Sequence, residues 1–421
     1  MAQAEAHAQW SRGHTITAGI AGNVLEWYDF AVYGFFAPII ARQFFPSEDP
    51  TLSLIAAFGA FAAGFLMRPV GAALFGHIGD RFGRGRSLVL SVMLMAIPTF
   101  LIGLLPNYES IGMAAAILMV VLRMAQGVAV GGEYTSSIVF LAEKAPEGRR
   151  AFFSSWAMFG ATGGIMLGSA VGAGLTNFLG DAALAEWGWR VAFLGGIAVA
   201  LVGYLIRRGM TEEDQGEPEP SPIKTAVTQH WREMLRVSAL NVVAAVSFYL
   251  MFVYIVTWLV DQVHEPSSTA LDINTISMAS LLVFIPVSAI LSDKYGRRLM
   301  LLIGMGSLAL LAYPLLMLMH HQDMMMILAG QIGFAAVLSM FMATLPAAMT
   351  EMFPRNIRVT AVSVGYNFTY AIFGGTAPIV AVWLIDRSHN DLAFAWYITA
   401  MAVVSFCVAL TLKDRRNEPL S

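Results

Sequence analysis

Runs of apolar residues, each about 20 residues long, alternate with short polar segments along the whole chain. A run of this length spans the hydrocarbon core of a bilayer as an α-helix, whereas membrane β-strands alternate apolar and polar residues over about ten positions. The pattern therefore predicts an all-α, polytopic membrane protein. Twelve transmembrane helices are expected, centred near Val24, Phe65, Leu94, Val121, Gly164, Ile197, Leu250, Leu282, Leu310, Val337, Tyr370 and Val403.

Composition supports this class and narrows the function. Of the 421 residues, 57% are hydrophobic and 13% are charged, whereas soluble domains have about 25% charged residues. A single cysteine, Cys407, excludes intrachain disulfides and cysteine metal clusters. The sequence shows no phosphate-binding glycine loop, metal-ligand cluster or nucleophile motif. We expect neither an enzyme nor a cofactor, and no nucleic-acid partner.

Basic residues are distributed unequally between the turns. Of the 25 lysines and arginines, 20 lie at the termini or in the turns after the even-numbered helices, and three lie in the odd-numbered turns. The remaining two, Arg68 and Arg123, lie at membrane depth. Because cytoplasmic loops carry the excess of Lys and Arg, both termini are expected to be cytoplasmic.

Two turn sequences recur about half a chain length apart. The Asp-Arg-Phe-Gly-Arg sequence at 80–84 follows helix 2, and a similar sequence at 293–298 follows helix 8. A Glu-x-x-Pro sequence at 143–146 follows helix 4 and returns at 351–354 after helix 10. Such spacing is typical of parallel repeats, and predicts two pseudo-symmetric six-helix bundles. The expected units are an N-terminal bundle at 1–206, a cytoplasmic linker at 207–236 and a C-terminal bundle at 237–421.

The first helix carries two carboxylates at membrane depth. Glu26, Asp29 and Tyr33 fall within an arc of about 60° on a helical wheel, so they form one stripe that must face the protein interior. A buried acid titrates closer to physiological pH than an exposed one, which makes Glu26 and Asp29 candidate proton-coupling residues. The alternative is a structural pair that satisfies backbone groups or an arginine of another helix.

The fourth helix carries a similar stripe. Arg123, Gln126, Glu133 and Ser137 lie within an arc of about 80°, but Arg123 and Glu133 are separated by about 15 Å of helix rise. They therefore cannot pair with each other. Glu133 joins the proton-coupling candidates, and Gln126 joins the candidate substrate ligands.

The two arginines at membrane depth leave alternatives open. Arg123 presents a planar fork suited to a carboxylate. It either binds the carboxylate of a substrate or is held by Glu26 or Asp29, and exchange between these states would couple protons to substrate. Arg68 is either a substrate ligand or part of a packing ion pair.

The second half offers aromatic and amide side chains instead of buried charge. Tyr254 lies in helix 7, and Tyr366, Asn367 and Tyr370 fall within an arc of about 100° of helix 11. Aromatic stripes are common in cores and interface belts. The functional alternative is a cage for the cationic or apolar part of a ligand. With Arg123, Arg68, Tyr33 and Gln126, these four residues complete the candidate substrate site.

Several motifs resemble a known family. The sequence Gly-x3-Asp-Arg-x-Gly-Arg-x-Arg at 76–86, with its echo at 293–298, is similar to the cytoplasmic loop motif of the major facilitator superfamily. The stretch Gly-Asn-Val-Leu-Glu-Trp-Tyr-Asp-Phe at 22–30 resembles the first-helix signature of its metabolite–proton symporters. The resemblance implies import of a small organic solute with protons across a bacterial cytoplasmic (inner) membrane. Known members carry proline and glycine betaine, 2-oxoglutarate and other dicarboxylates, citrate and tricarballylate, or shikimate.

The resemblance also implies gating residues. The aspartate of the loop motif, here Asp80, typically locks the cytoplasmic side together with basic residues, here Arg81 and Arg84. Asp293 and Arg297 occupy the corresponding positions of the echo.

The resulting hypothesis is a proton-coupled symporter that works by alternating access, with the proton as coupling ion and the lipid bilayer as surroundings. Protonation of Asp29, Glu133 or Glu26 releases Arg123 to bind a substrate carboxylate, and a monomer is sufficient. The solute is either a proline- or betaine-like zwitterion or a di- or tricarboxylate such as 2-oxoglutarate or citrate. Alternatives are a proton-antiporting exporter and, in another class, a membrane sensor or receptor without transport.

Overall fold

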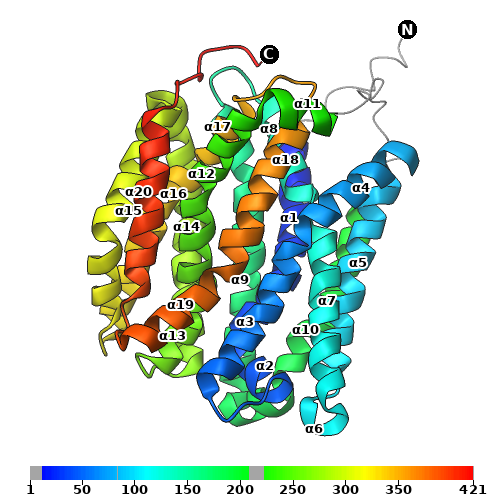
Figure 1. Cartoon of the computed structure of the whole chain (residues 1–421), viewed down its shortest axis with the longest axis vertical. Helices are drawn as coiled ribbons and strands as arrows, with labels where there is room; N and C mark the ends of the chain where they lie inside the picture. The colour runs from blue at the N-terminus through cyan, green and yellow to red at the C-terminus, as the bar shows by residue number, and fades with distance from the viewer. Residues whose placement is uncertain (1–11, 83, 208–221, 421) are drawn as a thin grey trace.

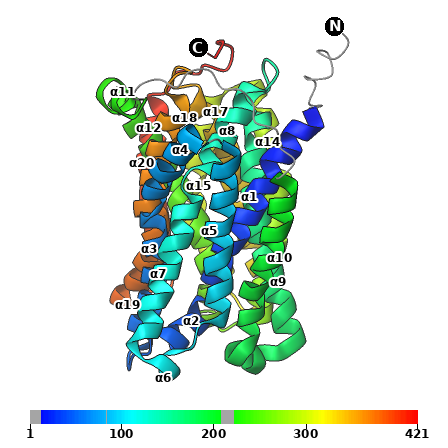
Figure 2. The same cartoon turned by 90° about the vertical axis from the view of Figure 1, so that its right-hand side faces the viewer.

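The computed structural model describes residues 12–82, 84–207 and 222–420. Side chains at 12–22, 25, 76–82, 84–89, 92, 133, 198–200, 202–207 and 222–224 lie outside this description. The described chain is helical, without a strand, and its helices run side by side along the long axis of the molecule (Figures 1 and 2).

The first half of the chain supplies six membrane crossings, several of them built from two consecutive helices. Its elements are α1 (Arg12–Phe35), α2 (Ala37–Phe44), α3 (Pro50–Leu66), α4 (Arg68–Phe82), α5 (Arg84–Leu104), α6 (Tyr108–Ile111), α7 (Met113–Val130), α8 (Glu133–Glu143), α9 (Arg150–Ala183), the π-helical turn η2 (Leu184–Gly188) and α10 (Trp189–Arg207).

The second half repeats this plan after the short helix α11 (Pro222–Gln229). Its elements are α12 (Trp231–Tyr249), the π-helical turn η3 (Leu250–Tyr254), α13 (Ile255–Asp261), α14 (Ser267–Tyr295), α15 (Arg297–Met319), α16 (Met324–Met342), α17 (Leu345–Thr350), α18 (Arg358–Thr369), the π-helical turn η4 (Tyr370–Gly374), α19 (Gly375–Ser388) and α20 (Phe394–Leu410).

Each of the twelve predicted helix centres falls inside one of these crossings. The prediction of an all-α protein with twelve membrane helices is therefore confirmed. Among the described residues, eight helical stretches are long and apolar enough to cross a membrane by length and composition alone, and Met93–Leu104 and Phe394–Leu410 are shorter apolar helices.

The boundary between the halves differs slightly from the predicted linker. α10 ends at Arg207, but α12 already begins at Trp231, so the last six residues of the expected linker belong to a membrane helix. The short helix α11, Pro222–Gln229, lies within the predicted linker.

The two halves stand beside each other, with α15 and α20 at one edge of the molecule and α4 and α5 at the other (Figure 1). They meet through α9 against α14 and through α3 against α19. The α12–η3–α13 crossing is buried from Leu240 to Leu259, whereas Trp231 and Leu235 near its start are exposed. α1 begins and α20 ends at the end of the molecule that carries α11, here called the α11 end.

Interruptions in the helices expose backbone groups at membrane depth, where water is absent, so other residues must satisfy them. The π-helical turn η3 has carbonyls at Met251 and Phe252 that accept hydrogen bonds of 3.1 Å from the side-chain amides of Gln331 and Asn274. Between α7 and α8, Gly131 and Gly132 break the helix. Asn367, from the other half, donates to the Gly131 carbonyl.

Candidate functional site

Arg123, on α7, is fully buried against aromatic rings. Its guanidinium carbon lies 4.4 Å from the ring centres of both Phe30 and Tyr33 and 5.3 Å from that of Phe61. Nη1 donates a 2.7 Å hydrogen bond to Oε1 of Gln126. Nε and Nη2 are buried and have no hydrogen-bond partner in the described part of the chain. Because a guanidinium carries five donors, this arrangement leaves capacity for an anion.

A close approach of two helices sets the position of Arg123. α3 and α7 touch through backbone atoms, since a Cβ at Gly127 would overlap the carbonyl of Gly64 and a Cβ at Gly64 would lie 2.9 Å from the carbonyl oxygen of Arg123. Only glycine permits this contact. It brings Arg123 over the rings that α1 and α3 present.

Asp29, on α1, is buried but points toward α5 and α10. Its Oδ1 atom and Cγ2 of Thr99 both lie 2.7 Å from the position that a Cβ would take at Gly196. The Thr99 side chain therefore lies beside that of Asp29, and its hydroxyl accepts a 2.7 Å hydrogen bond from Nε2 of Gln126. Thr99 and Gln126 therefore lie between Asp29 and Arg123.

The side-chain hydrogen bond of Arg123 goes to a neutral amide, that of Gln126. No described acid forms an ion pair with Arg123, so the direct pair with Glu26 or Asp29 is absent from the described structure. The physical reason is that the first-helix stripe divides between two neighbours. Asp29 faces α5 and α10, whereas the Tyr33 hydroxyl donates a 2.9 Å hydrogen bond to the Ala57 carbonyl on α3.

The structure describes the side chain of one of the two other proton-coupling candidates, Glu26, but not that of Glu133. Glu26 is buried on α1. The Glu133 side chain lies outside the described residues, although its backbone begins α8. Because α7 ends at Val130, the predicted stripe from Arg123 to Ser137 does not follow one continuous helix. Ser137 instead accepts a 3.1 Å hydrogen bond from Asn23 on α1.

Arg68 begins α4 and lies among four rings, here called the Arg68 aromatic group. Its guanidinium carbon is 5.3 to 5.9 Å from the ring centres of Trp27, Phe65, Tyr366 and Tyr370. Arg68 is fully buried and Nη1 has no partner among the described residues. Among the described residues Arg68 forms no ion pair, and its side-chain hydrogen bond goes to the amide of Asn367.

Asn367, on α18, joins the two halves. Its Oδ1 accepts a 3.2 Å hydrogen bond from Nε of Arg68, and its Nδ2 donates 2.7 Å to the Gly131 carbonyl. The same amide also donates to Ser363, one turn earlier. A single side chain thereby connects α18 with both α4 and the α7–α8 break.

The two arginine sites share one aromatic wall. The ring centres of Phe30 and Phe65 are 4.7 Å apart, and Phe61 and Phe65 are 5.0 Å apart. Tyr366 stacks on Tyr370 at 4.1 Å and lies 5.1 Å from Tyr134. Sequence reasoning missed the phenylalanines of this wall, since they are indistinguishable from ordinary core residues in an apolar helix.

Tyr254 lies apart from both arginines. Its ring contacts Phe58 and Phe394, each at 5.8 Å, so it is one ring removed from the wall around Arg123. Of the predicted substrate residues, Arg123, Gln126 and Tyr33 therefore form one group with Asp29 nearby. Arg68, Tyr366, Asn367 and Tyr370 form the second.

A small cavity of about 10 Å³ adjoins the second group and is lined by Tyr134, Met158, Asn241, Met349 and Tyr366 among others. This is the size of about one water molecule. This cavity is too small for a solute of several carbon atoms.

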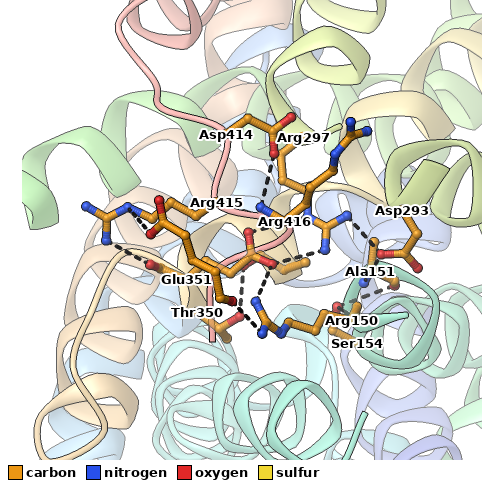
Figure 3. Close-up of polar contacts among 12 residues, drawn as sticks. Arg150, Ala151, Ser154, Asp293, Arg297, Thr350, Glu351, Asp414, Arg415 and Arg416 are labelled. Carbon is orange, nitrogen blue, oxygen red and sulfur yellow. Dashed lines mark hydrogen bonds and ion pairs between the residues drawn. The ribbon is translucent and has the colours of Figure 1, made fainter. Parts of the chain in front are cut away.

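Charged residues cluster at the α11 end (Figure 3). Arg150, Asp293, Arg297 and Glu351 form what we call the Glu351 network. Asp293 accepts hydrogen bonds from the backbone N–H groups of Ala151 (3.0 Å) and Phe152 (2.9 Å), and one of 2.8 Å from Arg297. Asp293 thus caps the positive end of α9, a helix of the other half.

Glu351 is the centre of this network. Its carboxylate lies 3.0 Å from Nη2 of Arg297 and 3.4 Å from Nη1 of Arg150. A second pair, Arg358 with Glu143, lies at 2.6 Å between the halves. Asp293 and Arg297 therefore lie together where the halves meet, whereas the side chains of Asp80, Arg81 and Arg84 lie outside the described residues.

The chain after α20, residues 413–420, lies over the Glu351 network and is here called the C-terminal segment (Figure 3). The carbonyl of Glu418 accepts a 2.7 Å hydrogen bond from Arg150. Arg415 donates 3.1 Å to the Glu351 carbonyl, and Arg416 donates 2.6 Å to the Lys294 carbonyl. The segment touches residues of both halves.

The halves also meet through polar contacts far from the α11 end. Ser169 on α9 accepts hydrogen bonds from Asn274 (3.2 Å) and Thr275 (2.9 Å) on α14. Contacts at both ends hold the halves together around the buried arginines.

Comparison with known proteins identifies the family. The family model described as Major Facilitator Superfamily matches residues 20–271 and 238–421. The chain is 34% identical over 421 residues to the proline/betaine transporter of Escherichia coli strain K12, with 96% of this chain and 84% of the relative covered. Identity and coverage are the same for the glycine betaine/proline/ectoine/pipecolic acid transporter OusA of Dickeya dadantii.

Solved structures show the same fold. A D-xylose–proton symporter superposes with a TM-score of 0.74 at 21% identity, covering 95% of this chain and 97% of that chain. The inward-open xylose transporter XylE of E. coli gives a TM-score of 0.73 at 18% identity, covering 95% of each. The chain belongs to the major facilitator superfamily of membrane transporters and is not an enzyme.

Proposed function

We propose that this protein is a proton-coupled symporter that imports a small zwitterion of the proline or betaine class across a bacterial inner membrane. The observation that carries the proposal is the pair of buried guanidinium groups, Arg123 and Arg68, each with unpartnered N–H groups and each lined by aromatic rings. The names of the relatives favour a solute with one carboxylate and one cationic nitrogen.

Arg123 binds the carboxylate. Its free Nε and Nη2 offer two donors, and the rings of Phe30, Tyr33 and Phe61 exclude water from the contact. In such a low-dielectric environment a charge-assisted hydrogen bond is strong. Gln126, which holds Nη1, orients the guanidinium.

The Arg68 aromatic group receives the cationic end. Its rings already surround a guanidinium carbon at distances typical of cation–π contacts. A quaternary or secondary ammonium is recognised by the same ring faces. The Arg68 guanidinium occupies this space in the present conformation, so substrate binding displaces it and breaks its contact with Asn367.

Asp29 carries the coupled proton, with Glu133 and Glu26 as the other candidates. An acid buried at this depth persists when it serves a pathway for ions or protons. Symport requires that only the empty deprotonated carrier and the loaded protonated carrier change their facing direction. Binding of the solute and of the proton must therefore favour each other.

The Glu351 network and the Arg358–Glu143 pair form the cytoplasmic gate, with Asp80, Arg81 and Arg84 as further gating residues. This assignment places the α11 end and both termini in the cytoplasm, in agreement with the charge distribution of the turns. Contacts of Ser169 with α14 close the opposite side. Rocking of the halves alternates the two closures.

Uptake into vesicles tests the proposal. Purified protein in liposomes with an alkaline interior is expected to accumulate labelled proline or glycine betaine, and collapse of the pH gradient is expected to abolish accumulation. Arg123→Gln is expected to lose binding. Accumulation under an acidic interior would instead support a proton-antiporting exporter. Competition by 2-oxoglutarate or citrate and not by betaine would support a dicarboxylate or tricarboxylate carrier.

A further inference from the structure

We propose that Thr99 is a positioning residue that transmits the protonation state of Asp29 to Arg123 through Gln126. The inference rests on the proposed function, because it explains how one proton and one substrate carboxylate act together without a direct contact between Asp29 and Arg123.

The geometry supplies a continuous path. Thr99, fully buried on α5, has its side chain beside Asp29 across Gly196, and its hydroxyl accepts a 2.7 Å hydrogen bond from Nε2 of Gln126. Oε1 of Gln126 accepts a 2.7 Å bond from Nη1 of Arg123. Thr99 Oγ1 is also 2.8 Å from the Met95 carbonyl of its own helix. The hydroxyl hydrogen can thus point either to Asp29 or to Met95.

The charged form of Asp29 aligns this path. A carboxylate only accepts hydrogen bonds, so Thr99 turns its hydrogen toward Asp29. The Thr99 oxygen then accepts from Gln126, whose own carbonyl accepts from Arg123. Every dipole points from the anion to the cation, and aligned hydrogen bonds strengthen one another in a low-dielectric interior. The aligned path strengthens the hydrogen bond from Nη1 of Arg123 to Gln126 and so keeps the guanidinium against Gln126.

The neutral form of Asp29 reverses the first link. A protonated carboxyl donates its hydrogen to the Thr99 oxygen, and Thr99 turns its own hydrogen to the Met95 carbonyl at 2.8 Å. The anionic end of the path is lost. No anion then compensates the positive charge of Arg123 through the path, so an incoming carboxylate binds it more strongly. Proton binding therefore raises the affinity for substrate.

Few other ionisable groups on the neighbouring helices compete for Asp29. Tyr28, next to it on α1, donates 3.0 Å to the Ala192 carbonyl. Arg190 on α10 donates to the carbonyls of Gly103 and Leu105. Neither forms an ion pair with Asp29 in the described structure. α3 and η3 contain no acidic or basic residue, and those of α9, Arg150 and Asp181, lie near its ends.

Other ionisable residues lie on the same helix and on adjacent elements. Glu26 lies one turn before Asp29 on α1, and Arg42 on α2 is bound to the Pro38 carbonyl. The side chains of Glu133 on α8 and of Arg84 and Arg86 on α5 lie outside the described residues.

Three variants distinguish the proposed role of the Thr99 hydroxyl, which is to transmit the protonation state of Asp29, from a role of the Thr99 side chain in packing. Thr99→Val keeps the shape and removes the hydroxyl, Thr99→Ser restores the hydroxyl, and Thr162→Val is the matched control. Thr162 is fully buried on α9 and its hydroxyl has no described partner. The measurement is the affinity for glycine betaine and proline of the purified full-length protein as a function of pH.

The unmodified protein, Thr99→Ser and Thr162→Val are expected to lose affinity by about tenfold as the pH rises and Asp29 ionises, a typical size for coupled sites. Thr99→Val is expected to bind with the same affinity across this range. An unchanged pH profile in Thr99→Val overturns the inference, as does a flat profile in Thr162→Val.

A substrate-free measurement separates this inference from the proposed function. The infrared carbonyl stretch of protonated Asp29, assigned by its loss in Asp29→Asn, is expected to shift in Thr99→Val and to stay in place in Thr162→Val. If the protein binds neither solute, the proposed function fails while this band still reports the Asp29–Thr99 contact. A band that does not move in Thr99→Val overturns the inference on its own.

Discussion

Nη1 of Arg358 lies 2.6 Å from Oε1 of Glu143, and the positions that correspond to them in the other half, Arg150 and Glu351, form the reciprocal pair at 3.4 Å. Both correspondences have an offset of 208 positions. Each half therefore supplies one acid and one base to the other. The duplicated sequence closes the α11 end by exchanging equivalent charges across the interface.

The two acids are predicted to contribute unequally to this closure. Glu351 contacts both Arg150 and Arg297 and its side chain is 4% exposed, whereas the Glu143 side chain is 32% exposed. Glu351→Gln is expected to shift the equilibrium toward opening of the α11 end by about 1–3 kcal/mol, less than the full cost of breaking a buried pair, because two arginines can rehydrate as the gate opens.

Spin-label distances across the α11 end measure this shift, in a background where the exposed Cys407 is replaced. Glu143→Gln serves as the comparison and is expected to have the smaller effect, since an exposed partner contributes little. Greater opening in Glu143→Gln than in Glu351→Gln contradicts the assignment of Glu351 as the centre of the network.

The C-terminal segment is predicted to restrain the same gate. Its carbonyl at Glu418 and its side chains at Arg415 and Arg416 bond residues of both halves. Removal of residues 413–421 is expected to favour opening by up to about 1 kcal/mol, because two of these contacts are only partly buried and the third is exposed. The same distance measurement reports it.

A second variant displaces the segment without removing it. Gly296 has φ +110, and a Cβ there would overlap the Asp414 carboxylate. Gly296→Ala is therefore expected to open the gate in the same direction, with an added strain of about 1 kcal/mol in the turn. If neither variant changes the distance distribution, the segment does not restrain the gate.

The fold could be predicted because each membrane helix requires a long run of apolar residues, and such runs can be recognised in the sequence. All twelve centres, including Leu250 and Tyr370, lie inside helical crossings. The interruptions at η3, at η4 and at Gly131 could not be predicted, because a π-helical turn keeps the same apolar composition as its flanks. These interruptions decide which backbone carbonyls reach Asn367 and Asn274.

The site could be predicted only in part, for a related reason. A charged residue such as Arg123 or Arg68 stands out in an apolar helix, and a helical wheel gives its direction. Its partner does not stand out when that partner is a threonine or a phenylalanine. Thr99 and Phe65 are partners only through the packing of different helices, which the sequence does not give. A helical wheel places Asp29 and Tyr33 on one side of α1, but it does not show that they face different neighbouring helices.

Asn367 is predicted to control access to the Arg68 aromatic group. Asn367→Asp offers Arg68 a charged partner and removes the donor to the Gly131 carbonyl. If Arg68 must leave the rings to admit the cationic end of the solute, this stronger bond is expected to weaken betaine binding by about tenfold, or 1.4 kcal/mol. Equilibrium binding to purified protein measures it.

Asn367→Ala is the matched comparison. It releases Arg68, so betaine binding is expected to be retained, while the lost bond to Gly131 weakens the closed state. Equal losses of affinity in Asn367→Asp and Asn367→Ala would show that Arg68 does not compete with the solute for the rings.

Gly127 is predicted to be essential for the position of Arg123. A Cβ at Gly127 would overlap the Gly64 carbonyl, so Gly127→Ala must push α7 away from α3. Overpacking of this kind typically costs about 1–3 kcal/mol, and it also moves Arg123 off the rings of Phe30 and Tyr33. Thermal unfolding and betaine binding are both expected to fall. Gly59→Ala on α3 is the control, because a Cβ there meets nothing within 4 Å, and alanine favours a helix by about 1 kcal/mol over glycine. A Gly127→Ala protein as stable and as active as Gly59→Ala would contradict the close approach of the two helices.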